Sequence, residues 1–222
     1  AGGMMVLHRK SGYIEYYNRH NSNLPSNNIY SIISDGYGGL WVASLEYLLH
    51  FDIDKRNFTI VDVDEDGHKL QQYNRLLFCD SKKRIWAGGE MGISVFNQVG
   101  TSLLPNTDFQ IASVLKQAFV NCFYETSSGY LWIGTRNGLF ALKESDKQFL
   151  QYTTENGLPS NVIYGILEDA YGRLWISTNQ GLSCLNPESG KFRNFTIMDG
   201  LQGNQFNAGA YCRKDNGYML FG

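Results

Sequence analysis

The chain has 222 residues, of which 43% are hydrophobic and 18% charged, a balance that supports a packed core and excludes a disordered polypeptide. Its formal net charge is −2, from 19 basic and 21 acidic residues, so no positive field attracts a phosphate backbone and nucleic acid is excluded as a partner. No apolar run approaches the roughly 20 residues of a membrane-spanning helix, and the first residues lack the features of a signal peptide, so we expect no membrane insertion by this segment.

The tryptophans of the chain mark a repeat. Trp41, Trp86, Trp132 and Trp175 are separated by 45, 46 and 43 residues, and Leu220 takes the same place 45 residues later. The residues just before them also repeat, because a Leu or Ile precedes every tryptophan and a Gly stands two or three positions before three of them. Such self-similarity at a period of about 45 residues is typical of an array of small structural units.

The predicted strands follow one order in every repeat. Residues 3–7 match residues 181–185, so the chain opens on the third strand of a unit. The first strands of the later units are β-rich runs at residues 29–34, 76–79, 120–124, 163–168 and 210–213. Asp35, Asp80 and Asp169 then mark a hairpin before the tryptophan strand. A third strand follows a recurrent glycine (Gly92, Gly138, Gly181), and a fourth closes the unit, as at 149–152 and 192–195.

Four short strands per repeat of 40 to 45 residues predict an all-β fold made of β-propeller blades with four antiparallel strands each. No window shows the periodicity of an amphipathic helix. We interpret residues 1–222 as a single partial propeller domain. It divides into half-blades at 1–23 and 201–222 and four full blades at 24–69, 70–114, 115–157 and 158–200. This makes about five blade equivalents, and we expect the fragment to self-associate or to pair its two half-blades, because an open arc exposes strand edges.

The tryptophans are interpreted as structural, since a residue placed identically in every blade packs between neighbouring sheets. Ligand contacts in propellers usually come from the loops on one face, where side chains vary while the scaffold repeats. Amide and charged side chains in these loops offer donors and acceptors for a hydroxyl-rich ligand. The candidate ligand-binding residues are Asn27, Asn28, Glu46, Glu90, Arg136, Asn137, Asn161, Asn179, Gln180, Asn204 and Asn207. The same amides also suit turns.

The remaining acidic, histidine and cysteine residues form no recognisable catalytic or metal-binding pattern. Residues 62–67 match the first part of an EF-hand calcium loop, but Tyr73 stands where the bidentate Glu of that loop belongs. We therefore interpret the run as a solvated acidic loop. No histidine follows His68, which leaves the later blades without a histidine acid or ligand. The four cysteines form no C-x-x-C pair and are interpreted as small buried hydrophobes. We predict no catalytic residue, no metal site and no cofactor.

Two segments carry a resemblance to a known family. Leu-Pro-Ser-Asn begins at Leu24 and again at Leu158, and in both copies an Asp and then G-x-L-W follow. These segments resemble the regulator propeller repeats of bacterial hybrid two-component histidine kinases. The closing stretches 199–207 and 218–222 resemble the last repeat of that family's second propeller, so the resemblance covers essentially the whole chain.

The resemblance implies a non-enzymatic piece of a periplasmic sensor region in an inner-membrane receptor whose other parts include further propeller blades and a histidine kinase. It implies an oligosaccharide from polysaccharide breakdown as the ligand, with the signal relayed to the kinase. Two alternative functions remain: a propeller lyase that opens cyclic peptide antibiotics, and an interaction scaffold that mediates receptor dimerisation. The lyase would need a histidine and metal-binding acids on the central face, which the placement of the histidines disfavours.

Overall fold

The computed structural model describes residues 2–44, 47–61, 74–106, 113–143 and 148–222. Their contacts divide the chain into two compact units, Ala1–Gln117 and Ala118–Gly222. Each unit consists of small antiparallel sheets in which consecutive strands are hydrogen-bonded neighbours. The acidic run at 62–67 and the candidate Glu46 lie outside the described residues.

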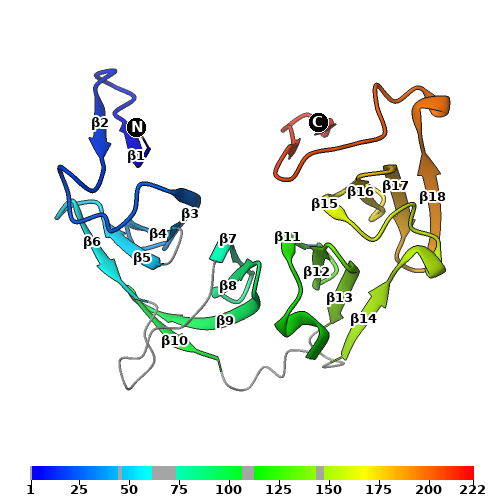
Figure 1. Ribbon diagram of the computed structural model, residues 1–222, viewed down its shortest axis with the longest axis horizontal. Helices are drawn as coiled ribbons and strands as arrows, with labels where there is room; N and C mark the ends of the chain where they lie inside the picture. The colour runs from blue at the N-terminus through cyan, green and yellow to red at the C-terminus, as the bar shows by residue number, and fades with distance from the viewer. Residues whose placement is uncertain (1, 45–46, 62–73, 107–112, 144–147) are drawn as a thin grey trace. The chain divides into compact units, whose positions relative to one another are not determined.

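The first unit contains one two-stranded and two four-stranded sheets (Figure 1). The two-stranded sheet is β1 (Met4–Leu7) and β2 (Ile14–Tyr17). The next sheet is β3 (Ile29–Ser34), β4 (Gly39–Ser44), β5 (Leu48–Asp52) and β6 (Asn57–Ile60). The third is β7 (Asn74–Cys79), β8 (Arg84–Gly89), β9 (Gly92–Val99) and β10 (Ser102–Pro105), followed by the 3-10 turn η1 (Ser113–Lys116).

The second unit contains two four-stranded sheets and one two-stranded sheet. The first is β11 (Val120–Glu125), β12 (Tyr130–Thr135), β13 (Gly138–Lys143) and β14 (Gln148–Tyr152). After the 3-10 turn η2 (Thr154–Asn156) come β15 (Ile163–Glu168), β16 (Leu174–Thr178), β17 (Gly181–Asn186) and β18 (Lys191–Phe195). The 3-10 turn η3 (Ile197–Asp199) leads to β19 (Tyr211–Arg213) and β20 (Met219–Phe221).

The prediction of propeller blades is confirmed, with four four-stranded and two two-stranded sheets in the described residues. Every first strand of a four-stranded blade also carries a register shift near its start, such as Val120/Cys122 and Ile163/Gly165. A shift of this kind places one extra residue in the strand and bends it. Because the irregularity recurs in every full blade, it belongs to the repeat itself.

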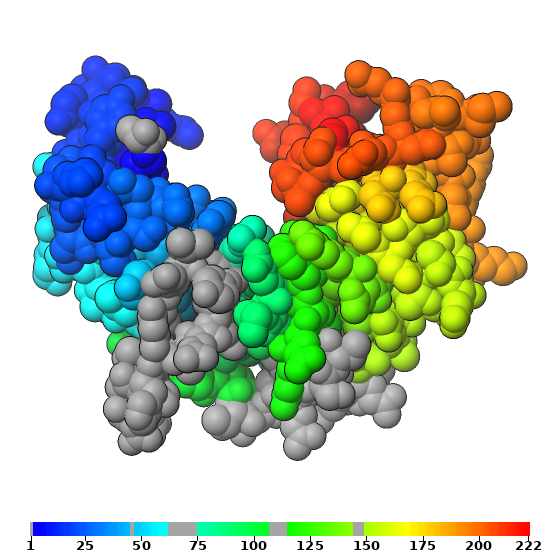
Figure 2. All heavy atoms as spheres, viewed as in Figure 1, coloured from blue at the N-terminus to red at the C-terminus, as the bar shows by residue number. Residues whose placement is uncertain are grey.

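The apolar cores lie between neighbouring sheets. In the second unit Trp132 of β12 packs with Ile163 and Ile166 of the next blade, and Tyr211 of the last sheet packs against the same cluster. Figure 2 shows the green to orange blades of this unit in direct contact. In the first unit Trp41 occupies the equivalent place against Leu77. Successive side chains of the second strand point to opposite faces of its sheet. Each face is therefore buried against a neighbouring sheet.

The recurrent glycine at the start of the third strand has a backbone reason. Gly92, Gly138 and Gly181 have φ values of 100°, 121° and 108°, a region that residues with a Cβ rarely adopt. A Cβ on Gly138 or Gly181 would also collide with the carbonyl oxygen at the end of its own blade's fourth strand. The spacing from tryptophan to glycine is therefore set by the turn between the second and third strands.

The described residues contain no helix that combines the length and apolar character needed to span a membrane. Their helical elements are the three 3-10 turns. Two of them, η2 and η3, share a capping arrangement in which Thr153 or Thr196 caps the turn and a glycine in the left-handed region ends it. The loops that follow the third and fourth full blades thus share the same local structure.

Candidate functional site

Each Leu-Pro-Ser-Asn loop has a buried leucine, and in the copy at residues 158–161 the Ser and Asn side chains accept backbone hydrogen bonds. Leu158 is buried in the core between blades, and the Ser160 hydroxyl accepts a hydrogen bond from the Val162 backbone N–H (3.1 Å). The side-chain oxygen of Asn161 accepts a hydrogen bond from the Thr154 backbone N–H (2.9 Å). This closes the loop onto the 3-10 turn that precedes it, a common role for Asn in loops.

Three predicted ligand-binding residues occupy this one loop position. Asn27 accepts from the Arg19 N–H (2.9 Å), Asn161 from the Thr154 N–H and Asn204 from the Ile197 N–H (2.9 Å). The backbone carbonyls of Asn161 and Asn204 also accept from Gly138 and Gly181 at the start of the preceding blade's third strand. Their repetition identifies these contacts as part of the scaffold, with the amide oxygens already engaged.

The other predicted residues are spread over the turns. Arg136 lies over the Phe119 ring, with Cζ 3.7 Å from its centroid, and Glu90 forms an ion pair with Arg75 (2.6 Å). Asn28, Asn137, Gln180 and Asn207 are exposed. The amide oxygen of Asn179 is buried and has no partner among the described residues. The hydrogen bond from the Gly138 backbone N–H to Asn161 brings residues 136, 137 and 161 together at one edge of the third full blade. The equivalent bond from Gly181 to Asn204 brings residues 179, 180 and 204 together at the same edge of the fourth full blade.

A second recurrent feature lies at the opposite ends of the strands, at the first hairpin of three of the four full blades. Asp35, Asp80 and Asp169 each accept two backbone N–H bonds through Oδ1, from the residues two and four positions later. This confirms the interpretation of these acids as turn residues. The second carboxylate oxygen of Asp80 and Asp169 accepts from the tryptophan of the same blade, Trp86 Nε1 at 2.8 Å and Trp175 Nε1 at 3.0 Å.

The third full blade breaks this arrangement. Thr126 stands where the other blades have Asp, and its hydroxyl accepts the Tyr130 backbone N–H (3.1 Å) as an Asp Oδ1 would. Thr has no second oxygen to receive the indole N–H. Trp132 is only 2% exposed, and its Nε1 has no hydrogen-bond partner among the described residues. In the first full blade Asp35 bonds His50 instead, but Trp41 Nε1 finds an acceptor on Gln98 (3.1 Å).

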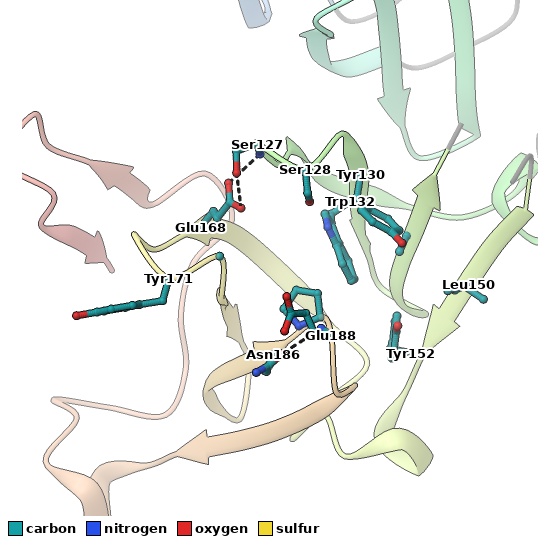
Figure 3. A pocket seen from close by; sticks show the side chains of 13 residues that line it. Ser127, Ser128, Tyr130, Trp132, Leu150, Tyr152, Glu168, Tyr171, Asn186 and Glu188 are labelled. Carbon is teal, nitrogen blue, oxygen red and sulfur yellow. Dashed lines mark hydrogen bonds between the residues drawn. The ribbon is translucent and has the colours of Figure 1, made fainter. Parts of the chain in front are cut away.

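A pocket of about 330 Å³ lies beside the unpartnered indole, between the third and fourth full blades of the second unit. In Figure 3 Trp132 lies near the middle of the view, with Tyr130 and Tyr152 to one side and Asn186 and Glu188 across from them. The pocket is formed at the hairpin ends of the blades, away from the loops that carry the predicted ligand-binding residues. Its lining consists of Ser127, Ser128, Tyr130, Trp132, Ala141, Leu150, Tyr152, Glu168, Tyr171, Gly172, Asn186, Pro187 and Glu188.

The walls of the pocket combine aromatic rings with polar groups. The Trp132 ring lies 6.2 Å from the Tyr130 centroid and 5.8 Å from the Tyr152 centroid, at interplanar angles of 35° and 31°. Burial raises the pKa of Tyr152, so its hydroxyl stays neutral at physiological pH. The buried Glu168 carboxylate accepts from the Ser127 backbone N–H (3.0 Å) and hydroxyl (3.1 Å). The pocket therefore offers an aromatic wall, one unsatisfied donor and a polar, acidic rim.

None of the pocket residues was among the predicted ligand-binding residues. The sequence held one signal, namely that Thr126 interrupts the Asp found six residues before the other three tryptophans. The same register places Tyr130 where the next blade has Arg173. Residues that depart from the repeat therefore indicate this blade, whereas polar residues in the loops do not.

Comparison with known proteins identifies the repeat. Residues 23–46, 115–137 and 157–180 match the model of the two-component regulator propeller family. Each matched segment contains a blade's loop, first strand and tryptophan strand. A comparison with curated proteins gives no significant match.

Solved structures share the fold. The extracellular domain of the putative hybrid two component system BT3049 from B. thetaiotaomicron is 23% identical, with a TM-score of 0.74 over 94% of this chain and 29% of that one. The corresponding domain of BT4673 from the same organism is 18% identical, with a TM-score of 0.76 over 100% of this chain and 29% of that one. The chain thus spans less than a third of either structure.

The structure of a lyase is similar at a lower level. Virginiamycin B lyase from Staphylococcus aureus is 16% identical, with a TM-score of 0.59 over 87% of this chain and 62% of that one. Within the part of the chain that the structure describes, no cluster of three or more His, Cys, Asp or Glu side chains is arranged to hold a metal ion. At 16% identity, the similarity to the lyase shows a shared fold alone.

Proposed function

The chain carries two-component regulator propeller repeats, and we propose on that basis that it is part of the extracytoplasmic sensor region of a hybrid two-component receptor. The matched repeats are the observation that carries the proposal. The two similar structures from B. thetaiotaomicron are described as extracellular domains of such systems, and they support it. In this role the chain itself is non-enzymatic, and the parent protein would be a membrane-anchored histidine kinase with its sensor in the periplasm.

The signal of this sensor is proposed to be an oligosaccharide released by polysaccharide breakdown. The amide and hydroxyl groups of the loops and of the pocket can both donate and accept hydrogen bonds, as a sugar surface requires. Aromatic rings at the pocket add flat apolar surface. A ligand shifts a conformational equilibrium only by its difference in affinity for two states. Relay to a kinase therefore requires that the sugar favour one arrangement of receptor subunits.

Calorimetric titration tests the proposal. The 222-residue chain and the complete sensor region of its parent receptor are each titrated with a panel of defined oligosaccharides. We expect saturable binding of one sugar class to the complete region, together with a change in receptor autophosphorylation in vesicles. If no oligosaccharide binds the complete region, the sugar hypothesis fails. Ring opening of a cyclic peptide antibiotic by the chain would instead establish a lyase.

A further inference from the structure

We infer that the pocket between the third and fourth full blades binds a single sugar ring, with Trp132 Nε1 donating a hydrogen bond to a ring hydroxyl or ring oxygen. This inference rests on the proposed function for the chemical class of the ligand. It places the contact at the hairpin ends of the blades, where sequence reasoning put no binding residue.

The unpartnered indole is the first argument. A buried donor without an acceptor costs about 1–3 kcal/mol, and the other three tryptophans of the chain avoid this cost through Asp80, Asp169 and Gln98. Trp132 does not, because Thr126 supplies one oxygen and uses it on Tyr130. Trp132 is one of the residues that line a pocket large enough for a ligand, so an acceptor that enters the pocket and reaches the buried Nε1 recovers the lost hydrogen bond.

The shape and lining of the pocket are the second argument. Its volume of about 330 Å³ is near the lower end of the roughly 300–1,000 Å³ that ligand pockets span, so it suits a single small ring. The half-buried Tyr130 and Tyr152 provide aromatic surface on one side, next to the almost fully buried Trp132. Ser128, Asn186 and Glu188 provide polar groups at the rim. A pyranose ring, with an apolar C–H face and hydroxyl groups at its edge, matches both surfaces.

The charges of the lining exclude other ligands. Glu168 and Glu188 line the pocket and no Lys or Arg does, so an anion would meet repulsion without a compensating cation. A metal or ammonium ion cannot accept a hydrogen bond and would leave the indole donor unsatisfied. A neutral ligand that carries both hydroxyl donors and oxygen acceptors satisfies the indole and the carboxylates together.

The indole signals of the ¹⁵N-labelled chain provide the test. Four tryptophans give four side-chain signals, which Trp→Phe variants assign one by one. The probes are methyl glucopyranoside, methyl galactopyranoside, methyl mannopyranoside and N-acetylglucosamine. We expect at least one of them to shift the Trp132 signal saturably while the Trp86 and Trp175 signals stay in place. A Trp132 signal that none of the four sugars shifts would overturn the inference and would indicate a pocket occupied by water alone.

Thr126→Asp is the decisive variant, because it installs the residue that the repeat uses elsewhere. Its second carboxylate oxygen should accept the Trp132 indole N–H, so the free protein's Trp132 signal should move toward those of Trp86 and Trp175. Sugar binding should then weaken at least tenfold. Trp132→Phe, which keeps an aromatic ring and removes the donor, should also weaken it about tenfold, a loss that corresponds to roughly one hydrogen bond. Unchanged affinity in both variants would refute the assignment.

Trp175→Phe is the matched control. Its indole is already bonded to Asp169 and does not line the pocket, so sugar affinity should not change. The two proposals fail separately. If oligosaccharides bind the complete sensor region equally well with and without Thr126→Asp, sugar sensing stands and this pocket is not its site. If single sugars shift the Trp132 signal but no oligosaccharide alters receptor phosphorylation, the pocket stands and the proposed signal does not.

Discussion

Trp175 donates a hydrogen bond from its indole nitrogen to the Oδ2 atom of Asp169, 3.0 Å away. The bond joins the first hairpin of a blade to its tryptophan strand, and the equivalent bond recurs between Trp86 and Asp80. The Asp and the tryptophan are six residues apart in both blades, so the pair is a local feature of the repeat. Trp41 also lacks this bond but donates to Gln98 instead, whereas the Trp132 indole has no acceptor among the described residues, and this distinguishes the blade that carries the pocket.

Replacement of Asp169 by Ala should lower the free energy of unfolding by about 2 kcal/mol, because the Trp175 indole and two backbone N–H groups of the hairpin lose their acceptor. Asp169→Thr should cost only about half as much, since a hydroxyl can replace Oδ1 as Thr126 does. Urea unfolding measures both. Equal losses in the two variants would show that the contacts of Oδ2, with the Trp175 indole and with Arg173 Nε (2.7 Å), and not the hairpin bonds of Oδ1, carry the effect.

Stability should fall when the protein is acidified. Burial by itself raises the pKa of Asp169, but hydrogen bonds from Trp175, Arg173 and Tyr171 outweigh it and hold the pKa below its ordinary value. The pKa of Asp35 is lowered in the same way, with His50, Tyr37 and Gly39 as the donors. A carboxylate with a depressed pKa in the folded state contributes stability that is present above its unfolded pKa of about 3.9 and is lost as the pH falls through the folded value.

This acid sensitivity is measured by urea unfolding at a series of pH values from about 7 down to about 3. An Asp35→Asn variant has one such carboxylate fewer, so its stability should decline less steeply over this range. A decline as steep as that of the unaltered chain would remove Asp35 from the explanation.

Gly165→Ala should loosen the last two-stranded sheet from the blade before it. A Cβ at Gly165 of β15 would overlap the Tyr211 ring of β19, and the ring is packed in the core of the second unit. We expect faster amide hydrogen exchange at Tyr211–Arg213 in the variant. Gly203→Ala is the control, since a Cβ there meets no atom within 4 Å. Equal exchange rates in the two variants would show that the Gly165–Tyr211 contact does not hold the sheet.

The cysteines should differ sharply in reactivity. Burial raises the pKa of the Cys122 thiol to about 12, and the thiolate is the reactive form. Cys212 is exposed. In the native protein near pH 8, a thiol reagent should therefore modify Cys212 quickly and Cys122 only after unfolding. Cys212→Ser should abolish the fast phase, and modification of Cys122 in the folded chain would contradict its burial.

The blades were predictable because their determinants are local. A short antiparallel strand pair joined by a hairpin, an Asp that caps the hairpin and a glycine with positive φ each depend on neighbours within a few residues. Repetition of these features along the chain then gave their order. The interpretation of Asn27, Asn161 and Asn204 as ligand-binding residues used the same local information but could not reveal that a backbone N–H seven or eight residues earlier holds each amide oxygen.

The sequence by itself determined that this protein is an array of four-stranded propeller blades, since these follow from residue spacing. Its Leu-Pro-Ser-Asn and G-x-L-W segments showed the resemblance to the regulator propeller repeats. The tertiary structure decided where a pocket forms, because Tyr152, Glu168 and Asn186 belong to different strands and turns and meet Trp132 only when two blades pack together. It also decided that the Trp132 indole is left without an acceptor. The substitution at Thr126 is visible in the sequence, but its consequence depends on which atoms surround the indole, and only the packed blades define them.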